Sequence, residues 1–221
     1  MDIRWVAGMS PIPGLMPWPG FAATAAPDFT SIVQAGSWSN PGSTATTVTM
    51  PSSVSSGDLL VYCVVNSSNI FTNPSGWTAA ANISGGPGAM RIGYKISDGT
   101  EGSTNVTVAS SAVRGAVLSV RCDKAIASVP AAGGGLCYYT SGNPPAQVIL
   151  SGARSAPVVV FGVSIRGIPS WSPTYDGSVR WEGSGIFAWK AFLTSPADVS
   201  IDVNDGGSPN CAGGCWIELA G

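Results

Sequence analysis

Two glycine-rich stretches of the sequence carry carboxylates close enough together to suggest acid–base catalysis or cation binding. Asp98 and Glu101 lie three positions apart, whereas a glycosidase needs two carboxyl groups facing each other across a cleft. Asp202, Asp205 and Gly206 resemble part of a calcium loop, but the terminal Glu of such a loop is missing. The first pair therefore predicts a structural turn, and at the second set we do not expect a metal site.

Histidine is absent, which excludes Ser-His-Asp and Cys-His catalysis and every His metal ligand. Two of the five cysteines, Cys63 and Cys122, lie in apolar runs and are predicted to be buried free thiols. Cys211 and Cys215 can pair with each other or with Cys137, and the paired C-x2-C knuckles of a zinc site are missing. We therefore expect no catalytic residue, no metal and no cofactor, and a protein that is not an enzyme.

Aromatic side chains cluster in one stretch of the second half, at Trp171, Tyr175 and Trp181. Aromatic faces beside a polar group such as Asp176 can stack on sugars, so this stretch is the best candidate for a small ligand. The alternative, which we favour, is that Trp181 packs into the core and Trp171 into an interface. These three residues are thus candidates for ligand or interface contacts.

Ionic side chains are scarce, at 10% of residues against roughly 25% in ordinary soluble domains. The net charge is −2 and no segment concentrates Lys or Arg, so neither nucleic-acid binding nor a polybasic membrane contact is expected. A surface so poor in charge promotes association. We expect it to be covered by neighbouring protein, in a homo-oligomer or a larger assembly.

Residues 1–28 form a distinct segment that is apolar yet dense in Pro and Gly, so a regular helix or a central strand is excluded. Extended, polyproline-like structure is expected instead. Its exposed apolar surface would be a liability in water, so the segment should strap its own subunit or, as we favour, act as an inter-subunit arm. The arm residues expected to make the contacts are Trp5, Met9, Leu15, Met16, Trp18 and Phe21.

The same prolines leave no uninterrupted apolar stretch for a secretory signal, and no segment reaches the ~18 apolar residues of a membrane span. We therefore expect the chain to be made in a cytoplasm and not to enter a membrane.

From residue 29 onward, short apolar runs alternate with Gly, Ser, Pro, Asn and Asp clusters, as in an antiparallel β-sandwich. The fold class predicted is all-β, a jelly-roll-like antiparallel sandwich preceded by the extended arm. The run from Leu59 to Val65 is apolar throughout and predicts a central strand covered on both faces, as does the run from Val158 to Val163. The strands predicted are 30–38, 44–50, 58–66, 76–83, 89–97, 104–109, 113–122, 146–150, 156–165, 178–183, 185–194, 198–203 and 214–220.

A weak internal similarity relates the two halves. The stretch from Asp58 to Tyr62 resembles Pro157 to Phe161, and Gly93 to Lys95 resembles Ala188 to Lys190. One interleaved jelly roll or two tandem sandwiches would both produce it. Residues 29–221 are thus one β-sandwich domain or two halves, 29–125 and 145–221, with the Gly- and Pro-rich stretch 123–145 as the best boundary.

Three stretches carry a family resemblance: SGDLLV at 56–61, PSGWT at 74–78 and GYKISDGTEG at 93–102. Their order is similar to that in β-sandwich modules of tailed-bacteriophage virion proteins, of the head-decoration and minor-tail type. The resemblance covers residues 44–122 and implies virion assembly without catalytic residues.

The function expected is therefore that of a capsid decoration, or cement, protein that stabilises the head through inter-subunit contacts. Its partners would be other virion proteins, either the major capsid protein or tail proteins, and its location the virion, assembled in the host bacterial cytoplasm. The alternatives are a minor tail or baseplate protein, or a carbohydrate-binding module for a host-surface glycan.

Overall fold

The computed structural model describes residues 29–35, 46–66, 71–85, 88–111, 113–139, 146–150, 157–165, 169–172, 176–182, 185–194, 199–203 and 210–221. Within these ranges the chain is all-β, with antiparallel sheets and no helix, as the alternation of short apolar runs predicts. Accordingly, no helix of the described part has the length and apolarity needed to cross a membrane. The predicted arm, residues 1–28, lies outside the described residues.

Fifteen strands are described, most of them rich in Val, Ile, Thr and aromatic residues, which suit a pleated, half-buried surface. They are β1 (Ile32–Gln34), β2 (Thr47–Thr49), β3 (Leu59–Asn66), β4 (Thr78–Gly85), β5 (Gly88–Ile96), β6 (Asn105–Thr107), β7 (Arg114–Cys122), β8 (Ala132–Tyr139), β9 (Ala146–Leu150), β10 (Val158–Ile165), β11 (Pro169–Ser172), β12 (Asp176–Glu182), β13 (Gly185–Phe192), β14 (Val199–Val203) and β15 (Asn210–Glu218).

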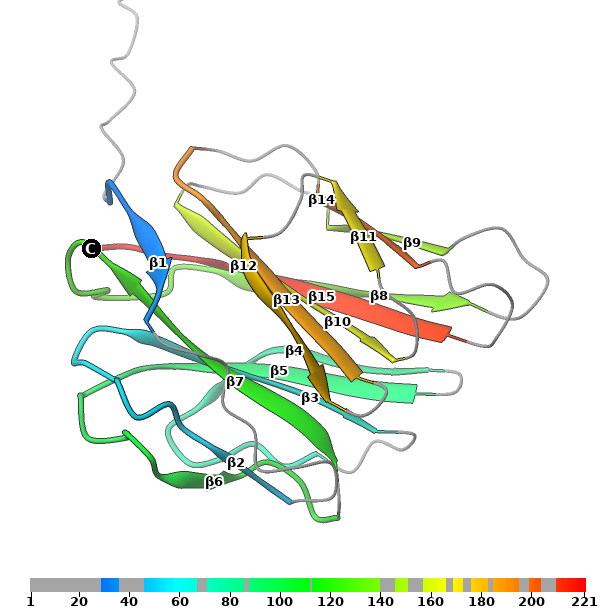
Figure 1. Ribbon diagram of the computed structural model, residues 1–221, viewed down its shortest axis with the longest axis horizontal. Helices are drawn as coiled ribbons and strands as arrows, with labels where there is room; N and C mark the ends of the chain where they lie inside the picture. The colour runs from blue at the N-terminus through cyan, green and yellow to red at the C-terminus, as the bar shows by residue number, and fades with distance from the viewer. Residues whose placement is uncertain are drawn as a thin grey trace, which may run out of the picture.

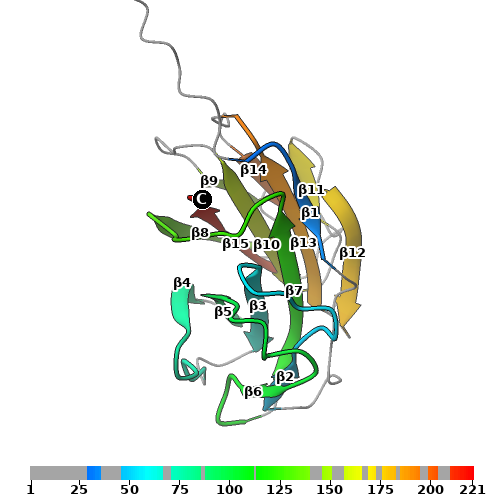
Figure 2. The same ribbon diagram turned by 90° about the vertical axis from the view of Figure 1, so that its left-hand side faces the viewer.

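These strands form four sheets stacked in layers (Figures 1 and 2). Two five-stranded sheets lie in the middle, in the orders β1-β7-β3-β5-β4 and β12-β13-β10-β15-β8. A two-stranded sheet, β2-β6, covers the first of them on its outer side, and the three-stranded sheet β11-β14-β9 lies on the far side of the second.

The two five-stranded sheets face each other and share one apolar cluster, the inner cluster. Strand β3 contacts β10, β5 contacts β15, and β7 contacts β13 across it. Because side chains alternate along a strand, every second residue enters this cluster. Its members include Leu59, Val61, Cys63 and Val65 of β3, Leu118 and Val120 of β7, Val159 and Phe161 of β10, and Phe187 and Trp189 of β13.

The remaining residues of β3 enter a second apolar cluster, the outer cluster, between the first five-stranded sheet and the β2-β6 sheet. Leu60, Tyr62 and Val64 are fully buried there. Trp77 follows the turn at Gly76 and closes this cluster, with its ring centroid 5.2 Å from that of Tyr62. Strand β3 is therefore covered on both faces, which confirms the prediction from its unbroken apolar run.

The strand order of the first half is repeated in the second. The first five-stranded sheet has the order β1-β7-β3-β5-β4, and the second, taken from its other edge, has the order β8-β15-β10-β13-β12. Strand β1 thus corresponds to β8, β7 to β15, β3 to β10, β5 to β13 and β4 to β12, and the sheet β2-β6 corresponds to β9-β14. With these correspondences, the contact of β5 with β15 matches the contact of β13 with β7, and the contact of β3 with β10 matches itself. The halves thus repeat one strand order, and some of the contacts between them are reciprocal, as at an isologous interface.

The predicted alignment of the halves is wrong by one residue in the central strands. It sets Tyr62 against Phe161, but Tyr62 lies in the outer cluster and Phe161 in the inner one. Because Val61, Val159 and Phe161 all enter the inner cluster, the alternation of faces sets Val61 against Val159 or Phe161 instead. A one-residue shift exchanges the two faces of a strand, and both faces of these strands are apolar, so the sequence does not reveal it.

The predicted boundary region, 123–145, contains packed structure rather than a plain linker. Its first part is tied to both halves: Ile126 donates its N–H to the C=O of Gly57 at 3.0 Å, and Ala127 donates to Ala220 at 2.8 Å. Its second part contains β8, which was not predicted and which pairs along its whole length with β15. Glycines make this strand possible, because a Cβ on Gly133 would lie 2.9 Å from the ring of Trp216.

Replacing Gly93 by Ala should destabilise the protein by about 1–3 kcal/mol, because the new Cβ would lie 2.5 Å from the buried ring of Tyr62. Urea unfolding measures this. Tyr62→Ala alone should cost about 3–5 kcal/mol, and in that background Gly93→Ala should cost far less. Additive effects of the two substitutions would show that the ring does not limit this position.

Candidate assembly site

The point where residues 1–28 join the body is firmly fixed. Phe29 is fully buried in the inner cluster, and Lys124 Nζ lies 5.7 Å from the centre of its ring. The carboxylate of Asp123, just beyond the end of β7, accepts the N–H groups of Thr30 and Ser31 at 3.0 and 3.3 Å and the hydroxyl of Thr30 at 2.6 Å.

These contacts hold Asp123 in its charged form. The hydroxyl of Thr30 has the largest effect, and together with the backbone N–H groups it lowers the pKa of Asp123 to about 2. The side chain lies at the exposed surface, so the interaction orders the chain locally rather than contributing to a core.

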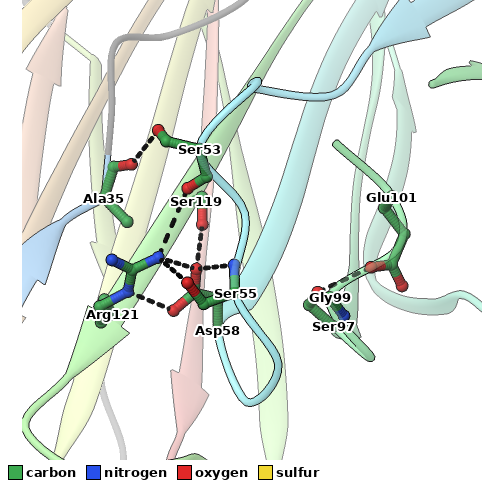
Figure 3. Close-up of polar contacts among 9 residues, drawn as sticks. All are labelled: Ala35, Ser53, Ser55, Asp58, Ser97, Gly99, Glu101, Ser119 and Arg121. Atoms are coloured by element: carbon green, nitrogen blue, oxygen red, sulfur yellow. Dashed lines mark hydrogen bonds and ion pairs between the residues drawn. The ribbon is translucent and has the colours of Figure 1, made fainter. Parts of the chain in front are cut away.

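Strand β1 is also tied at its far end. Ala35 donates its N–H to Ser119 at 2.8 Å, and its C=O accepts the hydroxyl of Ser53 at 2.7 Å (Figure 3). Between the two attachments, Val33 is 51% exposed, and it is the large apolar side chain left mostly in water among the residues that the structure describes. The strand is thus a fixed edge that presents an apolar residue.

An ion pair between a buried carboxylate and a partly exposed guanidinium stabilises the neighbouring loop (Figure 3). Arg121 on β7 donates to the carboxylate of Asp58 from Nε at 2.8 Å and from Nη2 at 2.7 Å. Asp58 is almost completely buried and accepts further bonds from the N–H of Ser55 and the hydroxyl of Ser119. Such a bidentate pair with every acceptor satisfied is strong, and removing one partner would leave a buried charge.

A second ion pair stabilises the adjacent loop after β5. Lys95 lies 2.6 Å from the carboxylate of Glu101, which also accepts the hydroxyl of Ser97 at 2.7 Å. Burial alone would raise the pKa of Glu101, but the bonds from Lys95, Ser97 and the backbone outweigh it and lower the pKa to about 2. Asp98 accepts the N–H and hydroxyl of Thr100 within the turn, so the predicted turn role of these carboxylates is confirmed.

The two loops brace each other. Gly57 donates its N–H to the C=O of Ser97 at 2.9 Å, and Ser97 donates to Asp58 at 2.8 Å. Gly99, at φ 93°, approaches the backbone of Ser56 so closely that a Cβ there would lie 3.1 Å from it. Two of the three motifs that carried the family resemblance, SGDLLV and GYKISDGTEG, thus contact each other at one end of the first half.

The described groups offer little chemistry. No cluster of three or more Cys, Asp or Glu suited to a metal ion occurs among the described residues. Cys63, Cys122 and Cys215 are buried free thiols, and burial raises the pKa of each, so they are poor nucleophiles. Cys215 therefore does not form the disulfide that the sequence allowed, because its thiol is buried in the inner cluster and packs as an apolar side chain.

The predicted site residues fall largely outside the described part. Trp5, Met9, Leu15, Met16, Trp18 and Phe21 of the arm lie there, as does Tyr175. Trp171 lies on β11 of the three-stranded sheet and Trp181 on β12 of a five-stranded sheet, both at sheet edges. The backbone thus assigns these two aromatics to different sheets.

The residues that sequence reasoning missed are Val33, Arg121 and Asp123. A signal for the last two was present, because Arg121-Cys122-Asp123 places charges at the end of an apolar run, where a strand leaves the core. No signal marked Val33, whose exposure depends on which strand lies at the edge of the sheet.

Comparison with known proteins identifies no relative: no family model, no curated protein and no solved structure matches the chain. The site must therefore be interpreted from its own geometry.

Replacing Asp123 by Ala should loosen the start of β1 while the body stays folded. Because both amides lose the carboxylate that accepts their hydrogen bonds, Thr30 and Ser31 should exchange their amide hydrogens severalfold faster. Hydrogen exchange read by NMR measures this, with Asp98→Ala as a control that removes an exposed carboxylate elsewhere. Unchanged exchange at both amides would contradict the role given to Asp123.

Glu101→Gln should flatten the acid dependence of stability. The folded-state pKa, about 2, lies below the ordinary value of 4.5, so the carboxylate stabilises the fold above about pH 4.5 and this contribution is lost as the pH falls towards 2. The contribution is about 2–3 kcal/mol, since one pKa unit corresponds to about 1.4 kcal/mol. Urea unfolding at pH 6 and pH 3 measures it. An equally steep pH dependence in the variant would contradict the assignment.

Proposed function

We propose that the protein is a non-enzymatic structural component of a tailed-bacteriophage virion, most simply a capsid decoration protein. The observation that carries the proposal is the attachment of the apolar segment 1–28 to the β body. The inner cluster holds Phe29, and the carboxylate of Asp123 holds Thr30 and Ser31. An arm that must bear load between subunits needs such an attachment, whereas a dispensable tail does not.

The composition of the chain supports the same proposal. Only 10% of the residues are charged, so the exposed surface depends on uncharged polar groups and is suited to being covered by protein. Each large apolar side chain of the arm that becomes buried would stabilise a contact by about 1.5–3 kcal/mol, and a symmetric shell repeats the contact many times.

The length of the arm suits contacts between subunits. Fully extended, 28 residues span up to about 90 Å, roughly twice the width of a globular body of this size. An arm of that reach extends beyond its own subunit, which favours the bridging role over a strap.

We further propose that each half, a five-stranded sheet with its small outer sheet, is a compact β-sandwich. The repeated strand order favours two such sandwiches in tandem over one interleaved jelly roll. In a decoration protein built in this way, the small outer sheets β2-β6 and β11-β14-β9 would lie at the two opposite ends of the stacked sheets.

Electron microscopy of the phage particles with gold-labelled antibody against the body of the protein tests the proposal. Decoration predicts hundreds of labels per particle, spread over the head. A few to dozens of labels on the tail would move the protein to the minor-tail or baseplate class, and unlabelled particles would refute a virion role. A glycan array with the purified full chain tests the carbohydrate-binding alternative independently.

A further inference from the structure

We propose that Asp98 is a modification site, at which the side chain cyclises onto the backbone nitrogen of Gly99 and reopens as isoaspartate without the help of an enzyme. The hydroxyl of Ser97 controls the rate. The site lies in the turn after β5 and does not depend on the virion role proposed above.

The carboxyl group of Asp98 is open to water, and the nitrogen that attacks it is unshielded. The Asp98 side chain is 63% exposed. The next residue is Gly99, at φ 93°, a backbone conformation that other residues rarely adopt. A larger residue would shield its own nitrogen with a side chain, and glycine does not.

Hydrogen bonds within the turn fold the Asp98 side chain back along the backbone. One carboxylate oxygen accepts the N–H of Thr100 at 2.9 Å and its hydroxyl at 2.6 Å. A bond from an aspartate to the N–H two residues ahead closes a small ring, as in other Asx turns. The carboxyl carbon of Asp98 and the nitrogen of Gly99 both belong to this ring, so the turn keeps the two reacting atoms near each other.

The bond between Gly99 and Ser97 opposes the reaction. Gly99 donates its N–H to the hydroxyl oxygen of Ser97 at 2.9 Å, and the nitrogen must give up this hydrogen when it attacks. Ser97 is itself fixed, because it is almost completely buried and donates its hydroxyl to Glu101 at 2.7 Å (Figure 3). Ser97 therefore slows the modification for as long as the turn is intact.

The chemistry needs only water. The nitrogen of Gly99 bonds to the side-chain carboxyl carbon of Asp98, and the hydrogen of that nitrogen leaves with the carboxyl hydroxyl as water. The cyclic succinimide then takes up water at either carbonyl. Opening at the side-chain carbonyl restores aspartate, whereas opening at the backbone carbonyl leaves isoaspartate, in which the main chain runs through the side chain.

Isoaspartate would loosen the contact between the two braced loops, because it adds a methylene group to the backbone before Gly99. Gly99 has little room to move, since a Cβ there would lie 3.1 Å from the backbone nitrogen of Ser56. The N–H of Asp98 also donates to Glu101 at 3.3 Å, and the longer backbone would displace it. Modification of one exposed residue would thus weaken this end of the first half.

Peptide mapping of the full chain, incubated at pH 6 and 37 °C, tests the proposal. Isoaspartate has the mass of aspartate, so the two peptides are separated by chromatography and identified by mass spectrometry, each aspartate in its own peptide. Isoaspartate should accumulate at Asp98 severalfold faster than at Asp123, which also lies at the surface but precedes Lys124.

Ser97→Ala should raise the rate at Asp98 severalfold, and Ser97→Thr, which keeps a hydroxyl, should retain the slow rate. Asp98→Glu is the matched control, because glutamate would have to close a larger ring and should leave this position unmodified. Should Ser97→Ala fold poorly, the comparison of Asp98 with Asp123 in the wild-type chain decides.

Isoaspartate that forms no faster at Asp98 than at Asp123 in the wild-type chain would overturn the proposal. Equal rates in the wild-type chain and in folded Ser97→Ala would overturn the role given to Ser97.

Discussion

The face-to-face packing of the two five-stranded sheets is the constraint on which the rest of the molecule depends. Each half presents one apolar face, and neither face can remain in water, so the halves fold as one body around the inner cluster. Phe29, Ile126 and Leu219 all belong to this cluster, so the residue that precedes β1, the stretch between the halves and the residue that follows β15 are held by the same packing.

The polar contacts specify detail within that framework. Few ionic groups are present, and four of them form two pairs: Arg121 with Asp58, and Lys95 with Glu101. Both pairs lie where loops leave the first sheet, and they brace loops that contain Gly57 and Gly99 at positive φ.

Sequence patterns predicted most of the strands because alternation and apolar runs are local properties. The strand β9 was predicted with its observed ends, and β3, β5, β7 and β10 within two residues. The two strands that were missed, β8 and β11, contain three consecutive glycines and a Pro-Ser start, which read as turns. The candidate site was predicted less well, because the exposure of Val33 and the bonds of Asp123 depend on residues distant in sequence.

By itself, the sequence determined the all-β class, the central position of β3, the buried free thiols Cys63 and Cys122, and the distinct character of residues 1–28. These follow from composition, local periodicity and the conformational limits of Pro and Gly. Only the tertiary structure decided that β8 completes the second sheet, that the halves repeat one topology, and that β1 is an edge held at both ends. Strand order and register depend on pairings between segments far apart in the chain, and a local pattern does not specify which partner a strand takes.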